Sequence, residues 1–433
     1  MRYVSTRAVP GEARQSVSAS EAIALGLAAD GGLFSPERLP QIDWGDAGDA
    51  PLDEIATRFL TPFFEGDALA PDLADICADA FNFPIELVPL PGERLSILEL
   101  FHGPTAAFKD FGARFLAACF SRLHGTSGSP LTILVATSGD TGGAVAAAFH
   151  RRPGIFVDVL FPDGQVSPRQ AQQLTCWGDN IRAFRVDGPF DACQSLVKAA
   201  FVDEELNARR RLSSANSINL GRLLPQASYY VWASLVHRAR TGNVPSFIVP
   251  TGNLGNALAC VWARDSGAPI GDIHFATNDN RTVPEFVQGA PWAPRPSVAT
   301  VANAMDVGNP SNMERLRALY DDDALRQTFT SSFVDDAAIR AQIPKDLETR
   351  GQVLCPHTAT ATCAYDRDFD ADHKAATDMV VVATAHPAKF ETVVEPLIGR
   401  EVAVPDNLKA LLDLPSHAID LAPDLDEFRR HFS

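Results

Sequence analysis

Short apolar runs alternate with helix-like segments from about residue 96 onward. The runs at 131–136, 155–161 and 181–186 are rich in β-branched residues and have the length of buried strands. Helices are predicted between and after them, over 143–150, 168–177 and 189–211, the last as one long helix. A strand–helix–strand series of this kind predicts a parallel sheet covered by helices.

A second series of the same kind follows. It begins with a predicted strand at 246–250, continues with one at 273–277 and closes with one at 379–383. Helical spacing predicts helices over 257–263, 313–320, 335–343 and 388–398. The stretch 281–310 is irregular and rich in proline, and long loops of that type are often functional or mobile.

The two ends of the chain differ from these series. Helices are predicted at 18–27, 53–64 and 71–81, with Ser18 or Ser20 beginning the first. The tail from Val404 is acidic and interrupted by prolines, which predicts a strap with a short last helix. We expect three parts: an N-terminal extension over 1–95, a first α/β domain over 96–220, and a second α/β domain with the strap over 221–433.

Composition and charge narrow the class of protein. Apolar residues make up 46% of the 433 positions and charged residues 21%, as in packed globular proteins. The net charge of -17 argues against nucleic acid as a main partner, because phosphate backbones require a basic face. The start of the chain has no apolar signal core, and no run is long enough to span a bilayer. The seven scattered cysteines fit reduced thiols, no metal site is expected, and the expected location is the cytoplasm.

One lysine stands in an unusual setting. Residues 101–112 read FHGPTAAFKDFG, which places Lys109 next to Phe108 and after a Gly-Pro turn. An apolar setting disfavours the ammonium form, and a neutral amine can form a Schiff base with an aldehyde. The alternative is a lysine whose stem covers apolar surface.

Two glycine loops each join a predicted strand to a predicted helix. They read TSGDTGG at 137–143 and TGNLGN at 251–256. Neither is a Walker loop or a Gly-x-Gly-x-x-Gly turn, and each could be only a tight turn. Helix N-termini at the carboxyl edge of a parallel sheet attract anions. With Lys109, they suggest pyridoxal phosphate acting on an amino acid. Thr384 follows the last predicted strand, where its hydroxyl could meet a pyridine nitrogen or cap the next helix.

Several motifs resemble those of the threonine synthase family, whose members are pyridoxal-phosphate enzymes of fold type II. The matching segments are ELFHGPTAAFKDFG (99–112), ATSGDTG (136–142), FDACQ (190–194), SANSIN (214–219), GNLGN (252–256), NAMDV (303–307), TAHPAKF (384–390), YVSTR (3–7) and GGLF (31–34). The similarity runs nearly end to end. It implies an α/β fold with two parallel-sheet βαβ domains of the fold type II kind and an N-terminal, mostly helical extension.

The resemblance implies a role for individual residues. Lys109 would hold the cofactor as a Schiff base and move protons, and Thr384 would face the pyridine nitrogen. The other implied cofactor contacts are Asp140, Gly252, Asn253, Leu254, Gly255 and Asn256, and the implied substrate contacts are Ser138, Thr141, Arg169, Asn216 and Asn219. Two positions depart from the family pattern: Leu254 stands where relatives often have Phe, and Gln165 where many have Lys. If that Lys binds phosphate, Arg169 is its candidate replacement.

The implied reaction converts O-phospho-L-homoserine and water into L-threonine and phosphate. Two alternatives remain open at this point. A related lyase could release phosphate and deaminate the product to a 2-oxo acid, and a non-catalytic protein could bind phosphate or an amino acid with the same loops. His102 is expected to order the lysine segment. The expected assembly is a monomer or homodimer, without nucleic acid or membrane partners.

Overall fold

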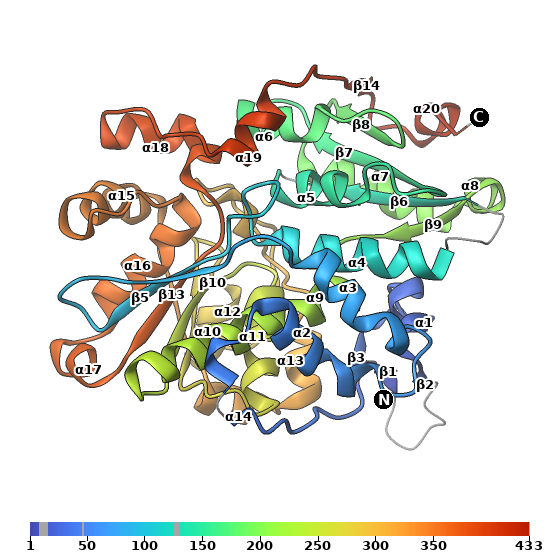
Figure 1. Ribbon diagram of the computed structural model, residues 1–433. Coiled ribbons are helices and arrows are strands. Elements are labelled where there is room, and N and C mark those ends of the chain that lie inside the picture. The colour runs from blue at the N-terminus through green and yellow to red at the C-terminus, as the bar shows by residue number, and fades with distance from the viewer. Residues whose placement is uncertain (8–15, 46, 125–129, 138, 433) are drawn as a thin grey trace.

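Two sheets, each with helices on its faces, form the body of the protein (Figure 1). The computed structural model describes residues 1–7, 16–45, 47–124, 130–137 and 139–432. The α/β class, with parallel strands and an N-terminal extension, is confirmed. Within the described ranges, no helix has both the length and the apolar character needed to cross a membrane.

The larger sheet has six strands and draws them from distant parts of the chain. Its order is β12 (Thr330–Phe333), β11 (Ile273–Thr277), β10 (Ser246–Pro250), β13 (Met379–Ala383), β5 (Leu95–Glu99) and β4 (Glu86–Pro89). All neighbours are parallel except β4, which runs antiparallel to β5. Met379 pairs with Ser246 on one side and with Leu95 on the other. The early strand β5 therefore lies in the sheet of the second predicted series.

The smaller sheet has five parallel strands. Its order is β14 (Ile419–Leu421), β8 (Ile181–Val186), β7 (Ile155–Pro162), β6 (Leu131–Ala136) and β9 (Arg211–Ser214). Every residue of β6 is buried, as expected for a central parallel strand covered on both faces.

The prediction of one long helix over 189–211 is wrong. The structure has α7 (Phe190–Val202), α8 (Glu204–Arg209) and then strand β9. Asp203 adopts an extended conformation, and its side chain accepts a 2.8 Å hydrogen bond from Leu206 N, so that it caps a new helix. Arg211 pairs with Leu131 of β6. Because Arg211 pairs with β6, the end of the predicted helix belongs to a strand instead.

Helices occupy most of the remaining chain. After α4 (Lys109–His124), they are α5 (Asp140–Phe149), α6 (Pro168–Thr175), α9 (Leu220–Leu223), α10 (Ala227–Thr241), α11 (Gly255–Asp265), α12 (Thr282–Val287), α13 (Met313–Leu319), α14 (Asp322–Thr328), α15 (Asp336–Arg350), α16 (Pro356–Asp368) and α17 (Ala371–Ala376). Short 3-10 turns include η4 (Leu224–Gln226), η5 (Asn303–Met305) and η6 (Pro387–Phe390).

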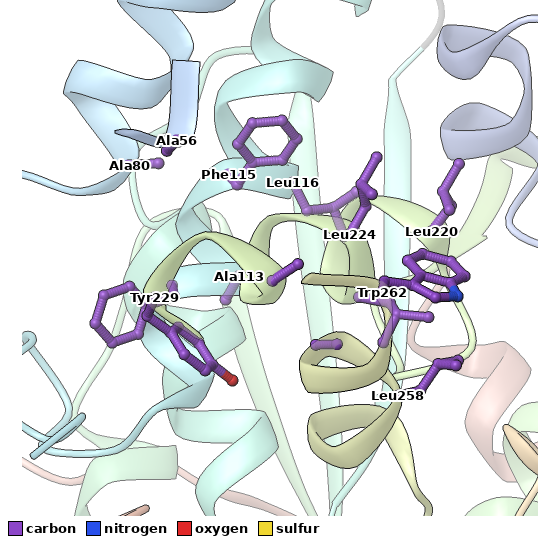
Figure 2. Packing of buried hydrophobic residues seen from close by; sticks show 14 of the residues in the cluster. Ala56, Ala80, Ala113, Phe115, Leu116, Leu220, Leu224, Tyr229, Leu258 and Trp262 are labelled. Atoms are coloured by element: carbon purple, nitrogen blue, oxygen red, sulfur yellow. The ribbon is translucent and has the colours of Figure 1, made fainter. Parts of the chain in front are cut away.

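The N-terminal extension packs against α4. It combines a small antiparallel sheet of β2 (Ser16–Val17), β1 (Tyr3–Ser5) and β3 (Phe34–Pro36) with helices α1 (Ala19–Leu25), α2 (Leu52–Leu60) and α3 (Leu73–Ala80). Ser18 and Glu21 form a capping box at α1. In Figure 2, Phe115 and Leu116 of α4 lie between Ala80 and Leu224. The extension therefore helps to hold in place the helix that begins at the predicted cofactor lysine.

The C-terminal tail spans both sheets. It leaves the larger sheet through α18 (Glu391–Ile398) and α19 (Asp406–Leu412), and it ends with β14 and α20 (Leu425–Arg430) beside β8 (Figure 1). Gln172 Nε2 of α6 donates to the Leu414 carbonyl at 2.6 Å, and Phe428 contacts Phe184 at 5.2 Å between ring centroids. The domain boundaries at residues 95 and 220 stay predictions.

Candidate active site

Three neighbouring parallel strands end at one edge of the larger sheet. Strand β10 leads into the loop 251–256, β13 into Thr384, and β5 into the segment that precedes Lys109. Because β10, β13 and β5 are adjacent and parallel, these three segments leave the sheet together. Phe108 N donates to the Thr384 carbonyl at 2.8 Å, and His386 N donates to the Ala106 carbonyl at 3.0 Å. The lysine segment is thus joined by its backbone to the end of β13.

The segment before Lys109 is a turn held by a buried carboxylate. Asp110 accepts hydrogen bonds from Thr105 N at 2.8 Å and from Thr105 Oγ1 at 2.6 Å. Ala106 has a positive φ of 53°, a conformation that costs energy for a residue with a β-carbon. Gly103 lies against Asp110, where a β-carbon would come within 2.5 Å of the carboxylate. These constraints fix where Lys109 leaves the turn and begins α4.

The amine of Lys109 is set up to lose its proton near neutral pH. Burial lowers its pKa to about 8, and the positive charges of Arg222 and Lys389 act in the same direction, while Asp140 opposes them. The Nζ atom lies 5.0 Å from the centroid of the Phe108 ring. Near neutral pH, a part of the Lys109 population is therefore in the neutral form, which is the nucleophile.

Asp140 forms a buried ion pair close to this amine. Its Oδ1 lies 2.9 Å from Lys389 Nζ and accepts a 3.1 Å hydrogen bond from Gln170 Nε2. Burial alone would raise the pKa of Asp140, but the ammonium groups of Lys389 and Lys109 more than offset it and hold the pKa well below its usual range. Asp140 is consequently an anion at the start of α5.

The loop 251–256 presents free backbone donors. Among hydrogen bonds of the described residues, none is donated by the backbone N–H groups of Gly252, Asn253, Leu254 or Gly255. Leu254 has a φ of 59° and immediately precedes α11. Unpaired amides at a helix N-terminus bind phosphate. The loop therefore suits the phosphate of pyridoxal phosphate, and Leu in place of Phe at 254 leaves its backbone amide available.

Side chains that sequence patterns alone did not single out support this loop. Asn253 Oδ1 accepts hydrogen bonds from Ser311 N at 2.7 Å and Ser311 Oγ at 2.9 Å, and its Nδ2 donates to Ser217 Oγ at 2.8 Å. Asn256 Oδ1 accepts from the hydroxyl groups of Tyr229 and Tyr230 at 2.6 and 2.8 Å. The buried Nδ2 of Asn256 has no partner, which leaves a donor at the first turn of α11.

A buried histidine accepts a hydrogen bond from the turn that lies against the loop. Ala304 N donates to His357 Nε2 at 3.1 Å, and the next residue, Met305, lies against Gly252. Burial, together with the charges of Lys109 and Lys389, lowers the pKa of His357 to about 4, so the ring is neutral and can accept this bond. No local sequence signal marks His357, because its role depends on η5 packing beside α16.

Thr384 does not supply the helix cap that follows β13. The structure gives that role to His386, whose Nδ1 accepts a 3.2 Å hydrogen bond from Ala388 N. The Thr384 hydroxyl takes part in none of the hydrogen bonds of the described chain. It is therefore available for a ligand at the sheet edge.

His102 contacts an acidic residue at the end of β5. Its Nε2 is 2.8 Å from Glu99 Oε2 at the end of β5. The hydrogen bond to Glu99 raises the pKa of His102 above its ordinary value. This contact is consistent with a role in ordering the segment.

The predicted substrate residues fall into different environments. Ser138 lies outside the described residues, Thr141 is half-buried in the first turn of α5, and Asn216 is half-buried after β9. Asn219 is buried, caps α9 through Gly221 N at 2.8 Å, and donates to the Ile23 carbonyl at 3.0 Å. Arg169 Nη1 donates to the Ala388 carbonyl at 2.8 Å and contacts Glu395 at 3.2 Å. Asn219 and Arg169 therefore already carry structural bonds.

This arrangement defines the class of protein, an enzyme that uses pyridoxal phosphate. A family model described as "Pyridoxal-phosphate dependent enzyme" matches residues 83–385, which include the lysine, both glycine loops and Thr384. Models described as "Threonine synthase N terminus" and "Threonine synthase, C-terminal" match residues 2–81 and 358–431. The chain belongs to the threonine synthase family and is a pyridoxal-phosphate-dependent lyase.

Similar proteins cover the chain over nearly its full length. Threonine synthase of Haemophilus influenzae is 38% identical over 420 residues, which cover 96% of this chain and 97% of that protein. Threonine synthase of Escherichia coli is 37% identical over 420 residues, with 96% of each chain covered. The structure of pyridoxal-phosphate-bound threonine synthase from Brucella melitensis has a TM-score of 0.89 and 34% identity, covering 100% of this chain and 99% of that one. The family and cofactor expected from the sequence motifs are thereby confirmed.

Proposed function

We propose that this enzyme converts O-phospho-L-homoserine and water into L-threonine and phosphate, the last step from aspartate to threonine. The observation that carries the proposal is the convergence of three strand ends, which brings an amine of lowered pKa, a free hydroxyl and a row of unpaired amides to one sheet edge. Family membership supports the same reaction.

In this proposal, Lys109 would hold the cofactor through its amine, and the same Nζ atom would move protons on the substrate. Its pKa of about 8 lets one group act as base when neutral and as acid when charged. When bound, pyridoxal phosphate supplies an electron sink for the carbanions formed next to the substrate nitrogen.

The remaining cofactor contacts follow from the free polar groups. The amides of 252–255 and the dipole of α11 bind the cofactor phosphate. The Thr384 hydroxyl would hold the pyridine nitrogen, and a neutral partner there would limit protonation of that nitrogen. Asp140, whose Oδ1 is already bound to Lys389, would contact the cofactor from the side of the smaller sheet.

The substrate contacts are proposed at the smaller sheet. Ser138 and Thr141 are proposed to bind the substrate carboxylate, and Thr141 lies in the first turn of α5, where a helix N-terminus offers amide donors. Asn216 and Asn219 are proposed near the substrate phosphate. The structural bonds of Asn219 make Asn216 the better placed of the two. Arg169 is proposed to help bind phosphate because Gln165 is exposed and uncharged.

Product analysis tests the proposal. With O-phosphohomoserine, the purified holoenzyme is expected to release equal amounts of phosphate and threonine. Lys109→Ala is expected to abolish both products and the visible absorbance of the covalently bound cofactor, whereas Lys198→Ala, at an exposed position on α7, leaves them unchanged. A 2-oxo acid in place of threonine would mean the deaminating alternative, and protein that takes up no pyridoxal phosphate would end the proposal.

The assembly is proposed to be a monomer or a homodimer in the cytoplasm. Light scattering coupled to size exclusion measures the mass directly, and a larger oligomer would contradict the proposal.

A further inference from the structure

A second lysine is buried within the same site. Lys389 follows β13 in the turn η6, and its side chain has no exposed surface. Its Nζ donates to the Thr105 carbonyl at 2.7 Å and lies 2.9 Å from Asp140 Oδ1. Thr105 belongs to the turn before Lys109, and Asp140 to the helix after β6. Lys389 therefore bonds both to the segment that carries the reactive amine and to the carboxylate of the opposite sheet.

The ion pair is almost fully buried. The Asp140 side chain is 3% exposed, and Gln170 Nε2 shares its Oδ1 with Lys389. Gln173 Nε2 donates to the same Thr105 carbonyl at 3.1 Å. Removal of one partner would leave the other charge buried and uncompensated, so each of the two charges constrains where the other lies.

The nearby groups form a small set of charges. Those that face Lys389 or Lys109 are Asp140 on α5, Asp110 on α4, Arg222 on α9, Cys355 and His357 at α16, and His386 beside η6. On the outer side of η6, Arg169 N donates to Glu391 at 3.1 Å and Arg169 Nη1 contacts Glu395. Among these groups, Asp140 and Lys389 act on Lys109 in opposite directions.

We propose that Lys389 is a positioning residue that binds Asp140 as its counter-ion, so that Asp140 does not form an ion pair with Lys109. This inference rests on the proposed role of Lys109. With Lys389 in place, its positive charge opposes the effect of Asp140 on Lys109, and this helps the amine to lose its proton. Without Lys389, the buried Asp140 anion has only Lys109 as a nearby lysine, and it stabilises the charged, non-nucleophilic form.

Lys389 also fixes the direction of the Asp140 carboxylate. Both hydrogen-bond donors from the described residues reach Oδ1, and none of them reaches Oδ2. Oδ2 would thereby remain available to bind the cofactor or the substrate. The same ammonium, through the Thr105 carbonyl, sets the distance between α5 and the turn of Lys109.

The test measures the titration of Lys109 directly. Pyridoxal phosphate is added to the full-length protein after cofactor removal, and the rate of its covalent capture is recorded against pH. Lys389→Met is expected to raise the midpoint of this profile by about one pH unit or more, which lowers the capture rate at pH 7 about tenfold. Lys389→Arg keeps the positive charge, and its midpoint is expected to lie close to the wild-type value. Lys198→Met serves as the matched control at an exposed lysine.

A double variant separates charge from folding. Asp140→Asn alone removes the anion and is expected to lower the midpoint. Asp140→Asn with Lys389→Met removes both charges and should return it toward the wild-type value. If Lys389→Met does not fold, the midpoints of Asp140→Asn and of the double variant are compared instead, because these two proteins differ only at Lys389. Equal midpoints in those two, or an unchanged midpoint in Lys389→Met, would overturn the inference.

The proposed function has a separate outcome. Wild-type protein that captures no pyridoxal phosphate at Lys109 contradicts the proposed function itself. Wild-type protein that captures it and releases phosphate and threonine, with no midpoint shift on Lys389→Met, contradicts only the inference about Lys389.

Discussion

The α-carbon of Gly252 faces the backbone of Met305 so closely that a β-carbon added to Gly252 would lie 2.6 Å from the Met305 Cα. The contact brings η5, from the irregular stretch 281–310, against the proposed phosphate loop. That stretch therefore packs directly against the proposed phosphate loop.

Gly252→Ala is expected to displace the loop or η5, because neither backbone can yield easily. We expect pyridoxal phosphate affinity to fall about 10- to 100-fold and stability to fall by about 1–3 kcal/mol. Cofactor titration and thermal unfolding measure the two effects. Gly178→Ala, where an added β-carbon meets nothing within 4 Å, is the control. Wild-type affinity in Gly252→Ala would contradict the close contact.

Asp306 should make stability depend on pH. Burial, assisted by the charge of Asp336, raises its pKa from 3.8 to about 7, although Thr300 and Asn278 donate hydrogen bonds to it. Between these values the unfolded chain loses the proton and the folded chain keeps it. The folded state is therefore destabilised as pH rises from about 4 to about 7, and the effect is constant above that range.

Asp306→Asn is expected to remove this dependence. Relative to the wild type, the variant should gain on the order of 1–3 kcal/mol between pH 4 and pH 8, less where solvent screens the carboxylate. Urea unfolding at several pH values measures the difference. A difference that is constant with pH would show that Asp306 is ionised throughout.

Thr384→Val is expected to act on catalysis and not on folding. Valine keeps the shape of the side chain, and the helix cap is provided by His386. Loss of one hydrogen bond to a cofactor atom should lower kcat about 10- to 100-fold, with Tm nearly unchanged. Thr349→Val, at an exposed position on α15, is the control. A fall in Tm without loss of kcat would assign Thr384 a structural role.

Substitution of Asn219 should mainly affect stability, whereas substitution of Asn216 should mainly affect substrate binding. Asn219→Ala breaks the cap of α9 and leaves buried groups unpaired, so we expect a loss of about 2–3 kcal/mol in the free energy of unfolding. Asn216→Ala is expected to raise KM for O-phosphohomoserine about tenfold with little change in stability. Thermal unfolding and initial-rate kinetics distinguish the two residues, and a KM unaffected by Asn216→Ala would remove that residue from the proposed site.

Local sequence patterns determined much of the site. The apolar run of β6, the capping box at Ser18 and the glycine loops are readable because spacing, turn residues and caps act within a few positions of the chain. The lysine motif was equally visible, since the FHGPTAAFKDFG segment is contiguous.

Other features were decided only by the tertiary structure. Pairing of β5 with β13, recruitment of Arg211 into β9, and the contact between Lys389 and Asp140 each join residues that lie far apart in the sequence. No periodicity encodes such pairs. They form because strands must satisfy their backbone hydrogen bonds and because a buried charge must meet its opposite, and which partners meet depends on how the whole chain packs.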